Sequence, residues 1–331
     1  MAHPTYVFGA HQIGSMSKED IQSFLSILKK HGVRNIDTAR IYTDSEQRLG
    51  EVDAAISFII DTKAPAFAPH SLTRASITAG LTESLTRLNT DKVDIYYLHG
   101  PDATTPIEET VDTIQDLHRQ GKFARFGLSN FLAADVRRIH AYATKKGGVV
   151  PSVYQGNYNA FARATEKELF PVLRELGMSF YAYSPLAGGF FAKDPDALAQ
   201  KKAEGRFDEG ANVHGGMYGA LYNKPAMVEA LREWRRIAAD AEGETSVMLA
   251  YRWAVFHSAL DAGKGDAIIV GASRPAQLEQ TLKGLEAGPL KKETVERIER
   301  LWKDVEKDAP LDNFNSFLKG KLEAGAASRG G

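Results

Sequence analysis

Hydrophobic residues recur three or four positions apart in several stretches of the chain, and a short apolar run follows each of them. Residues 21–28 carry apolar side chains at the spacing of one helix face, Gly32 breaks the pattern, and an apolar run then ends at Asp37. The same alternation recurs along the chain. It predicts eight strands separated by helices, within YVFGA, VRNI, SFIIDTK, VDIYYLH, KFARFGLS, PSVYQG, MSFYAYS and DAIIVGAS.

Strands that alternate with amphipathic helices form parallel βαβ units, and eight such units predict a single (β/α)8 barrel of the α/β class. The alternative is an open, doubly wound sheet, which is disfavoured because no G-x-G-x-x-G follows the first strand. We assign residues 1–320 to the barrel and expect residues 321–331 to form a flexible tail. We expect residues 185–225 to form a long lid loop after the seventh strand. We also expect a C-terminal extension after Leu301.

Composition narrows the classes of function. The 331 residues include 41 basic and 42 acidic side chains, so the formal net charge of -1 attracts neither nucleic acid nor anionic lipid. The absence of cysteine excludes thiolate catalysis and Cys-ligated metal. We find neither a signal-peptide pattern nor an apolar run long enough to span a membrane. These features predict a cytoplasmic protein without nucleic-acid, membrane or metal partners, and they leave the oligomeric state open, a homo-oligomer included.

Polar side chains stand at the ends of three successive predicted strands. Asp37 closes the second strand with Tyr42 five residues later, Lys63 closes the third, and His99 closes the fourth. In a parallel barrel these strand ends meet on one face. The ordinary pKa of tyrosine is about 10, so proton exchange at neutral pH needs a cation beside the phenolate. Lys63 can supply that charge, with Asp37 keeping the ammonium ionised.

This set of residues predicts a site that acts on a carbonyl group. His99 could donate a hydrogen bond to the same oxygen that Tyr42 protonates, while a cofactor delivers the hydride. Each residue also has a structural explanation: Asp37 could cap a helix, Lys63 could lie at the barrel rim, His99 could be a core histidine, and Tyr42 could pack a loop. Their joint occurrence at three successive strand ends favours the catalytic interpretation.

The motifs IDTARIY, DTKA, YLHGPD, GLSN, VYQGNYN and YAYSPLAGG occur in this order between residues 7 and 285. Their order and spacing resemble those of the aldo-keto reductases. The stretches ELFPVLRELGMSFYAYSPLAGG, VYQGNYNA and GRF look most like the aflatoxin-aldehyde reductase subfamily. The resemblance implies a catalytic tetrad of Asp37, Tyr42, Lys63 and His99, with Tyr42 as general acid and NADPH/NADP+ as the cofactor.

The same resemblance implies a route for the cofactor along the strand ends. Ser129, Asn130 and Gln155 would hydrogen-bond the carboxamide, and Tyr183 would stack on the nicotinamide ring. The small residues of SPLAGG would let backbone N–H groups approach the pyrophosphate. The other cofactor-binding residues implied are Ser184, Leu186, Gly188, Gly271, Ser273, Arg274, Gln277 and Gln280.

The segment GASRPAQLEQTL has two interpretations. Ser273 could simply be the N-cap of a helix. In the family interpretation the segment holds the adenosine phosphate at a helix N-terminus. Arg274 would then meet the 2′-phosphate, which favours NADPH over NADH. Thr281 stands where many relatives have Asn, so the adenine contact there departs from the family pattern.

Four residues are candidates for the substrate site: His11, Met217, Tyr218 and Lys224. His11 stands where relatives often have Met, and an ordinary surface histidine is the alternative. Subfamily members that prefer acidic aldehydes carry arginines after an MY pair and at the C-terminus, whereas this chain has Gly219 and Leu221. We therefore expect no arginine clamp for a carboxylate, although Lys224 could reach the site as a point charge.

Three functions fit these observations to different degrees. The leading one is NADPH-dependent reduction of aldehydes or dicarbonyls to alcohols. A non-catalytic nicotinamide-binding regulatory subunit of the same fold is the alternative, and the complete tetrad argues against it. A glycosidase that uses Asp37 and Asp61 as its two carboxylates would leave the motifs GLSN and SPLAGG unexplained.

Overall fold

The computed structural model describes residues 3–208, 213–241 and 244–317, and its strands form a closed parallel barrel. Neighbours pair in chain order, and β8 returns to β1. The (β/α)8 barrel is confirmed, and the open sheet is excluded. The strands are β1 Thr5–Gly9, β2 Asn35–Asp37, β3 Ile59–Lys63, β4 Val93–Leu98, β5 Phe123–Ser129, β6 Pro151–Asn157, β7 Ser179–Tyr183 and β8 Ala267–Val270.

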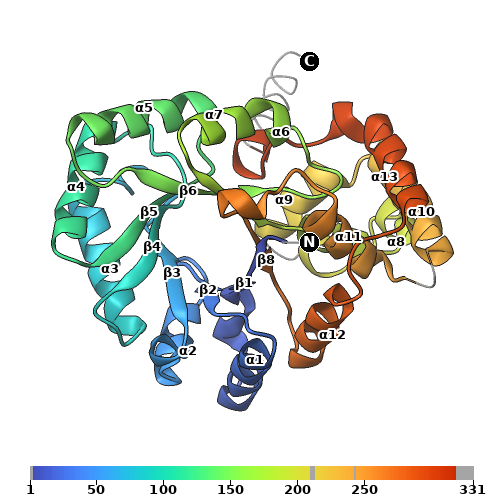
Figure 1. Ribbon diagram of the computed structural model, residues 1–331, viewed down its shortest axis with the longest axis horizontal. Helices are drawn as coiled ribbons and strands as arrows, with labels where there is room; N and C mark the ends of the chain where they lie inside the picture. Colours follow the sequence, from blue (N-terminus) through green and yellow to red (C-terminus); the bar gives the residue numbers. More distant parts are fainter. Residues whose placement is uncertain (1–2, 209–212, 242–243, 318–331) are drawn as a thin grey trace.

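Helices surround the strands, as Figure 1 shows. The first helix begins at Lys18, before the apolar pattern at residues 21–28, where the hydroxyl of Ser17 accepts a hydrogen bond from the N–H of Asp20 at 3.1 Å. The α-helices are α1 Lys18–Lys30, α2 Ser45–Glu51, α3 Arg74–Arg87, α4 Ile107–Arg119, α5 Ala133–Lys145, α6 Thr165–Glu168, α7 Phe170–Glu175, α8 Pro195–Ala199, α9 Val213–Tyr222, α10 Pro225–Asp240, α11 Ser246–Phe256, α12 Pro275–Leu285 and α13 Lys292–Val305.

Alternating strand residues fill the inside of the barrel. On β4, Ile95 and Tyr97 belong to the interior cluster, whereas Tyr96 packs in the larger core between the strands and the helices. On β3, Asp61 and Lys63 are two residues apart and therefore share the inner face. Polar side chains thus enter the barrel below the strand ends as well as at them.

The predicted lid after β7 contains short helices. The 3-10 helix η3 (Ala187–Ala192) is followed by α8, by the 3-10 helix η4 (Gly205–Phe207) and by α9; residues 209–212 lie outside the described part. The C-terminal extension comprises the end of α13, a 3-10 helix at Glu306–Asp308 and a segment over residues 309–317 that returns to the barrel mouth. The tail predicted at residues 321–331 lies outside the described residues.

The start of α12 differs from the interpretation in which Ser273 is the N-cap of the helix. Its N-cap is Arg274, not Ser273. The backbone N–H and the hydroxyl of Ser273 instead donate to Oε1 of Gln277, at 3.2 and 2.8 Å. The helix therefore begins one residue later than a serine cap would place it.

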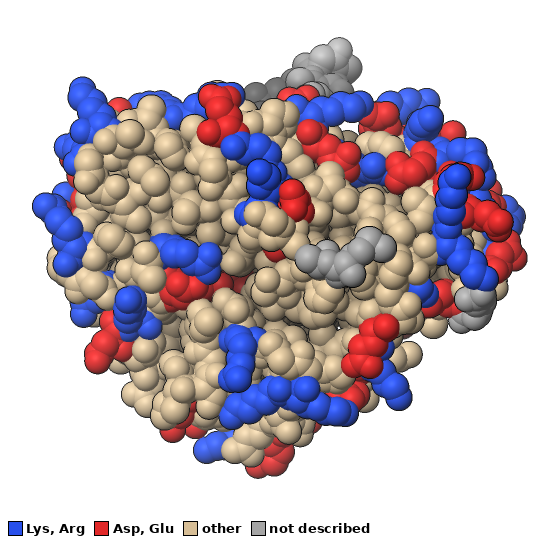
Figure 2. Space-filling model, viewed as in Figure 1, with Lys and Arg blue, Asp and Glu red and all other residues tan. Residues whose placement is uncertain are grey.

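Charges of both signs are mixed on the surface. On the face shown in Figure 2, Lys and Arg lie beside Asp and Glu around the edge of the molecule, and the centre is largely uncharged. Among the described residues, no helix is both long and apolar enough to cross a membrane.

Candidate active site

The four residues predicted as a catalytic set converge at one mouth of the barrel. Asp37 ends β2, Lys63 ends β3, His99 directly follows β4, and Tyr42 lies in the turn between β2 and α2. A cavity of about 850 Å³ opens at these strand ends, and Asp37, Tyr42 and His99 line it. Lys63 is 0% exposed and lies beneath them. The ends of three successive strands thus bring a phenol, an imidazole and an ion pair together.

Asp37 and Lys63 form the buried ion pair. Nζ of Lys63 donates to Oδ1 and Oδ2 of Asp37 at 2.8 and 2.6 Å, and to the carbonyl oxygen of Thr38 at 2.8 Å. Nε2 of Gln155 donates to Oδ1 of Asp37 at 2.8 Å. Burial opposes the ammonium charge, but the attraction of Asp37 and Tyr42 outweighs it and raises the pKa of Lys63. Lys63 is therefore a fixed cation at neutral pH.

Tyr42 lies above this cation. Nζ of Lys63 is 4.9 Å from the centre of the Tyr42 ring. Burial raises the pKa of Tyr42 above its ordinary value of 10.0, and Lys63 lowers it only in part through its charge and a hydrogen bond. Lys63 thus acts in the direction that eases loss of the phenolic proton, while burial acts against it. The phenol is protonated at neutral pH and can act as an acid.

His99 stands beside the phenol. The two rings are nearly perpendicular, at 82°, with their centres 6.0 Å apart. Burial, Lys63 and His11 together lower the pKa of His99 well below 6.5. The imidazole is therefore neutral at neutral pH and keeps one N–H that can donate to a ligand oxygen.

The residues predicted to hold the carboxamide line the same cavity, together with Tyr183. Nδ2 of Asn130 donates to the carbonyl oxygen of His99 at 2.8 Å, and the hydroxyl of Tyr183 donates to Oδ1 of Asn130 at 2.9 Å. Ser129 accepts from Nδ2 of Asn130 at 3.0 Å. These contacts tie the end of β5 to the end of β7 and fix the tyrosine ring against the cavity.

The turn after β7 exposes its backbone to the cavity. Ser184, Ala187 and Gly188 have positive φ angles of 55°, 51° and 69°, and Gly189 has a φ of 103° that strongly favours glycine. A Cβ atom at Gly188 would lie 2.2 Å from the ring of Tyr218. Ser184, Leu186 and Gly188 line the cavity as predicted. Closely approachable backbone of this kind suits an anionic group such as a pyrophosphate.

The cavity continues to the end of β8. Gly271, Ser273, Gln277 and Gln280 line it there, as does Thr281. Arg274 is exposed at the N-cap of α12 and is not among the lining residues. The structure thus places most of the predicted phosphate segment at the cavity and this arginine at its edge.

The predicted substrate residues divide into two groups. His11, Met217 and Tyr218 line the cavity. The His11 ring lies 4.7 Å from the Tyr42 ring, and the Tyr218 hydroxyl is 3.1 Å from Oγ of Ser184. Lys224 is not at the cavity, because its Nζ donates to the carbonyl oxygen of Asp308 at 2.6 Å.

The two-carboxylate alternative fails on geometry. Asp61 is 0% exposed and does not line the cavity, while Asp37 is paired with Lys63. A glycosidase needs both carboxyl groups beside the substrate.

Comparison with known proteins decides the family. The sequence profile of the Aldo/keto reductase family matches residues 5–303. The chain belongs to this family. It is 39% identical to the oxidoreductase sirO of Leptosphaeria maculans, over 93% of this chain and 96% of that protein. It is 38% identical to human aldo-keto reductase family 7 member A3 (93% and 97% covered) and 36% identical to rat aflatoxin B1 aldehyde reductase member 2 (93% and 87% covered).

The protein is therefore an oxidoreductase of the aldo/keto reductase family, and its resemblance to the aflatoxin-aldehyde reductases is confirmed. Members of the family generally use NAD(P)H.

Several residues of this aldo/keto reductase line the cavity without having been predicted, among them Arg206, Phe67 and Phe314. Nη2 of Arg206 is 3.3 Å from Nδ1 of His11, and its guanidinium lies 5.6 Å from the centre of the Tyr218 ring. The motif GRF contains Arg206, but nothing in its local pattern shows that the lid brings this side chain to His11, just after β1. Phe67 and Phe314 lie in segments without hydrophobic periodicity.

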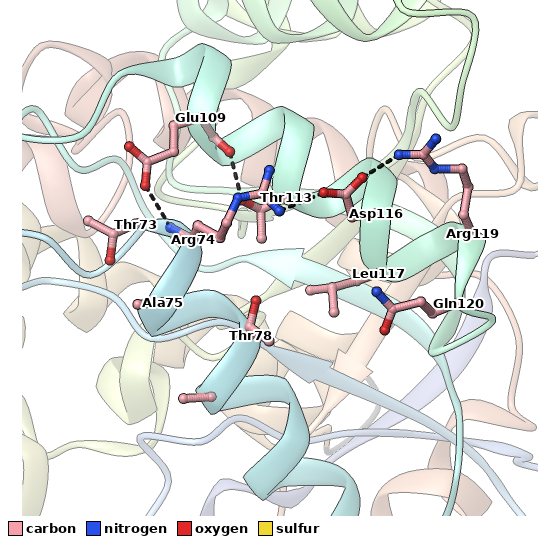
Figure 3. Close-up of a pocket in the computed structure, with 11 residues that line it drawn as sticks. Thr73, Arg74, Ala75, Thr78, Glu109, Thr113, Asp116, Leu117, Arg119 and Gln120 are labelled. Carbon is pink, nitrogen blue, oxygen red and sulfur yellow. Dashed lines mark hydrogen bonds and ion pairs between the residues drawn. The ribbon is translucent and has the colours of Figure 1, made fainter.

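A second hollow lies on the outside of the barrel, between α3 and α4 (Figure 3). Its charged groups bind one another. The backbone N–H of Arg74 donates to Oε1 of Glu109 at 2.8 Å, and Asp116 pairs with both Arg74 and Arg119. It shares no lining residue with the catalytic cavity, so we assign it no part in the reaction.

Proposed function

We propose that the protein reduces aldehydes or dicarbonyls to alcohols with NADPH. The observation that carries the proposal is the protonated phenol of Tyr42 beside neutral His99, both at the cavity and both above the buried Lys63–Asp37 pair. A hydroxyl and an imidazole N–H that face one space can together polarise a carbonyl oxygen and protonate it as negative charge develops.

Each residue of the tetrad has a separate role in this proposal. Tyr42 gives its phenolic proton to the substrate oxygen. Lys63 stabilises the phenolate that remains, because its charge already acts on Tyr42 in the resting protein. Asp37 holds the ammonium in place with both carboxylate oxygens. His99 donates a hydrogen bond that orients the carbonyl.

The cavity fits an extended dinucleotide. Its lining runs from the tetrad past Asn130 and Tyr183 to the turn at Gly188, and on to Ser273 and Gln277 beyond β8. When bound, NADPH supplies a hydride to the carbonyl carbon. Ser129, Asn130 and Gln155 would hold the nicotinamide end, and exposed Arg274 would meet the 2′-phosphate from the cavity edge. This last contact would favour NADPH over NADH.

An aldehyde is the substrate class that the relatives' names support, since several similar proteins are called aflatoxin B1 aldehyde reductases. We propose that neutral carbonyl compounds are preferred. Gly219 and Leu221 follow the MY pair, where subfamily members that prefer acidic aldehydes carry arginine, and Lys224 is engaged with Asp308 away from the cavity. The guanidinium that does line the cavity, Arg206, is already in contact with His11 and Tyr218, so a carboxylate that loses hydration there would have to draw it from these contacts.

The test follows a label from cofactor to product. Wild-type protein is mixed with NADPH deuterated at C4 of the nicotinamide and with benzaldehyde or methylglyoxal, and the alcohol is analysed by mass spectrometry. We expect deuterium on the former carbonyl carbon. Tight NADPH binding without transfer to either compound would support the regulatory-subunit alternative instead, and absence of binding would overturn the whole proposal.

A matched pair of compounds tests the preference for neutral substrates. Benzaldehyde and 4-carboxybenzaldehyde share the same reacting group and differ by one remote charge. We expect kcat/KM for benzaldehyde to be higher. A clear preference for the charged compound would refute the no-clamp proposal and make Arg206 the first residue to substitute.

A further inference from the structure

The turn that carries Tyr42 leads into a helix that begins without a side-chain cap. Asp44, the N-cap of α2, has a φ angle of 52°, in the left-handed region, and its side chain makes no capping hydrogen bond. Ser45 and Glu46 follow as the first two residues of the helix, and both are buried. Two polar side chains buried at such a helix start need partners elsewhere in the fold.

Ser45 is bound to the residue that follows Asp37. Its Oγ donates to the carbonyl oxygen of Ala10 at 2.8 Å and lies 2.8 Å from Oγ1 of Thr38, which is also buried. A hydroxyl has one hydrogen, so Ser45 donates to Ala10 and accepts from Thr38. This residue therefore joins α2 to the end of β2 and to the 3-10 helix η1 (Ala10–Ser15), which follows β1.

Glu46 is bound to the residue that precedes Lys63. Thr62 lies between Asp61 and Lys63 on β3, so its side chain points out of the barrel, towards the helices. Its Oγ1 donates to Oε1 of Glu46, and both side chains are buried. Burial raises the pKa of the Glu46 carboxyl, although this hydrogen bond acts to lower it. The second residue of α2 is thus joined to the strand that carries Lys63.

The backbone of the turn is tied to the same helix start. The N–H of Tyr42 donates to the carbonyl oxygen of Ala39 at 2.9 Å, and the N–H of Ser45 donates to the carbonyl oxygen of Tyr42 at 3.0 Å. On the side of η1, a Cβ atom at Gly14 would lie 1.5 Å from the carbonyl oxygen of Thr43, so only glycine lets the two backbones approach this closely. A displacement of Ser45 would therefore move Tyr42.

Four buried side chains make up what we call the α2 anchor: Thr38, Ser45, Glu46 and Thr62. Each threonine is next in the sequence to one member of the Lys63–Asp37 pair, and the two residues of α2 stand three and four positions after Tyr42. None of the four lines the cavity. They can therefore affect the reaction only through the residues that they hold.

We propose that the α2 anchor positions the Tyr42 phenol against the Lys63–Asp37 pair and the substrate oxygen. A shift of about 1 Å in a reacting group can cost about two decades in rate. The anchor joins the turn of the proposed acid to both strands of the ion pair, so it fixes the distance over which Lys63 acts on the phenol. This inference rests on the proposed reductase function and adds positioning residues to it.

Loss of one hydroxyl tests the anchor. In Thr38→Val and in Ser45→Ala, kcat for NADPH-dependent reduction of benzaldehyde should fall about ten- to thirtyfold, whereas KM and the Kd for NADPH should stay within about twofold. Thr38→Ser keeps the hydroxyl and should hold kcat within about threefold of the wild type. An equal fall in Thr38→Ser and Thr38→Val, or a kcat within about threefold of the wild type in Ser45→Ala, would overturn the proposal.

Thr110→Val is the matched control for a buried hydroxyl with a purely structural role. Thr110 on α4 is buried, its hydroxyl donates to the carbonyl oxygen of Leu72 at 3.0 Å, and it lies outside the cavity. This variant should lower the midpoint of urea unfolding about as much as Thr38→Val does and leave kcat within about twofold. A comparable fall in kcat here would show that kcat follows stability and not the position of Tyr42, and would overturn the proposal.

Hydrogen exchange separates this proposal from the reductase function, because it needs no turnover. The segment over residues 39–45 contains the bonded amides of Tyr42 and Ser45. Mass spectrometry should show faster exchange there in Ser45→Ala, and no change in Thr110→Val. If the wild type reduces no carbonyl compound yet exchange accelerates in this way, the anchor stands and the reductase proposal fails. If the wild type is a reductase and Ser45→Ala changes neither kcat nor exchange, the anchor is refuted and the reductase proposal stands.

Discussion

Two aspartates lie side by side in the barrel in opposite situations. Asp37 on β2 and Asp61 on β3 are register partners, and both are buried. Asp37 receives two hydrogen bonds from Lys63 and one from Gln155. Asp61 receives one from the backbone N–H of Ile95, and its Oδ2 has no hydrogen-bond partner among the described residues. Neighbouring positions on one inner surface thus carry an ion pair and an acid that has no ion-pair partner among the described residues.

The difference shows what a buried charge requires in this fold. Burial raises the pKa of Asp61 well above 3.8, and the nearby charges of Asp37 and Asp94 raise it further. Asp61 is therefore a weaker acid than usual, whereas Asp37 accepts two hydrogen bonds from the ammonium of Lys63. We call Asp61 and Tyr97 the interior group. The Tyr97 hydroxyl also lacks a hydrogen-bond partner of good geometry in the described part of the chain. The catalytic set holds its charge with partners, and the interior group stays neutral.

Removal of the cation should have the largest effect. In Lys63→Met, Asp37 becomes a buried charge without a counterion, so the free energy of unfolding should fall by about 3–5 kcal/mol. Reductase kcat/KM should fall by about two to three decades, because the phenolate loses its stabilising charge. Urea unfolding and steady-state kinetics measure the two effects.

The control for this variant is Asp37→Asn/Lys63→Met, which removes both charges. It should recover most of the lost stability and none of the activity. Equal stability of the wild type and Lys63→Met would mean that the ion pair does not hold the site together.

Asp61→Asn should have the opposite effect on stability. The pKa of Asp61 is higher in the folded than in the unfolded chain, so the wild type loses stability as pH rises from about 3.8 through the folded-state value. A neutral amide removes this penalty. We expect a gain of about 1–3 kcal/mol at neutral pH, larger at about pH 8 than at about pH 5.

Urea unfolding at both pH values measures that gain, and Asp91→Asn is the control because Asp91 is exposed. A gain that is absent, or that shrinks as pH rises, would show that Asp61 is not a neutral acid in the folded protein.

Tyr97→Phe should have the smallest effect. Within the described residues its hydroxyl makes no hydrogen bond of good geometry, although the Gln155 side chain acts on it, so removing the oxygen should change the free energy of unfolding by less than about 1 kcal/mol. It should also change kcat/KM by less than about threefold. A large loss of activity would mean that the interior group takes part in the reaction and that our division of the barrel interior is wrong.

The sequence predicts the barrel, and the meeting of the four polar residues at one mouth of it, because both depend on local patterns. Hydrophobic periodicity marks the strands, and parallel closure then brings Asp37, Lys63 and His99 to one mouth wherever the helices lie. Family motifs predict the cofactor route in the same way, since each follows a strand end.

Two of the failures share a different cause, which is contact between distant segments. Lys224 turns to Asp308, 84 residues away, and Arg206 crosses from the lid to His11. The left-handed backbone of Phe67 leaves no mark in its sequence. Ser273 fails as a cap because Gln277 accepts its hydrogen bonds, so the helix begins after Arg274.

Tyr42→Phe, compared with Tyr97→Phe, tests the central claim that the phenol at the cavity is the proton donor. The measurement is kcat/KM for NADPH-dependent reduction of benzaldehyde, with the Kd for NADPH determined on the same preparations. We predict that Tyr42→Phe lowers kcat/KM by about two to four decades and leaves the Kd within about twofold. A folded Tyr42→Phe protein that kept more than about a tenth of the wild-type kcat/KM would contradict this assignment of the acid.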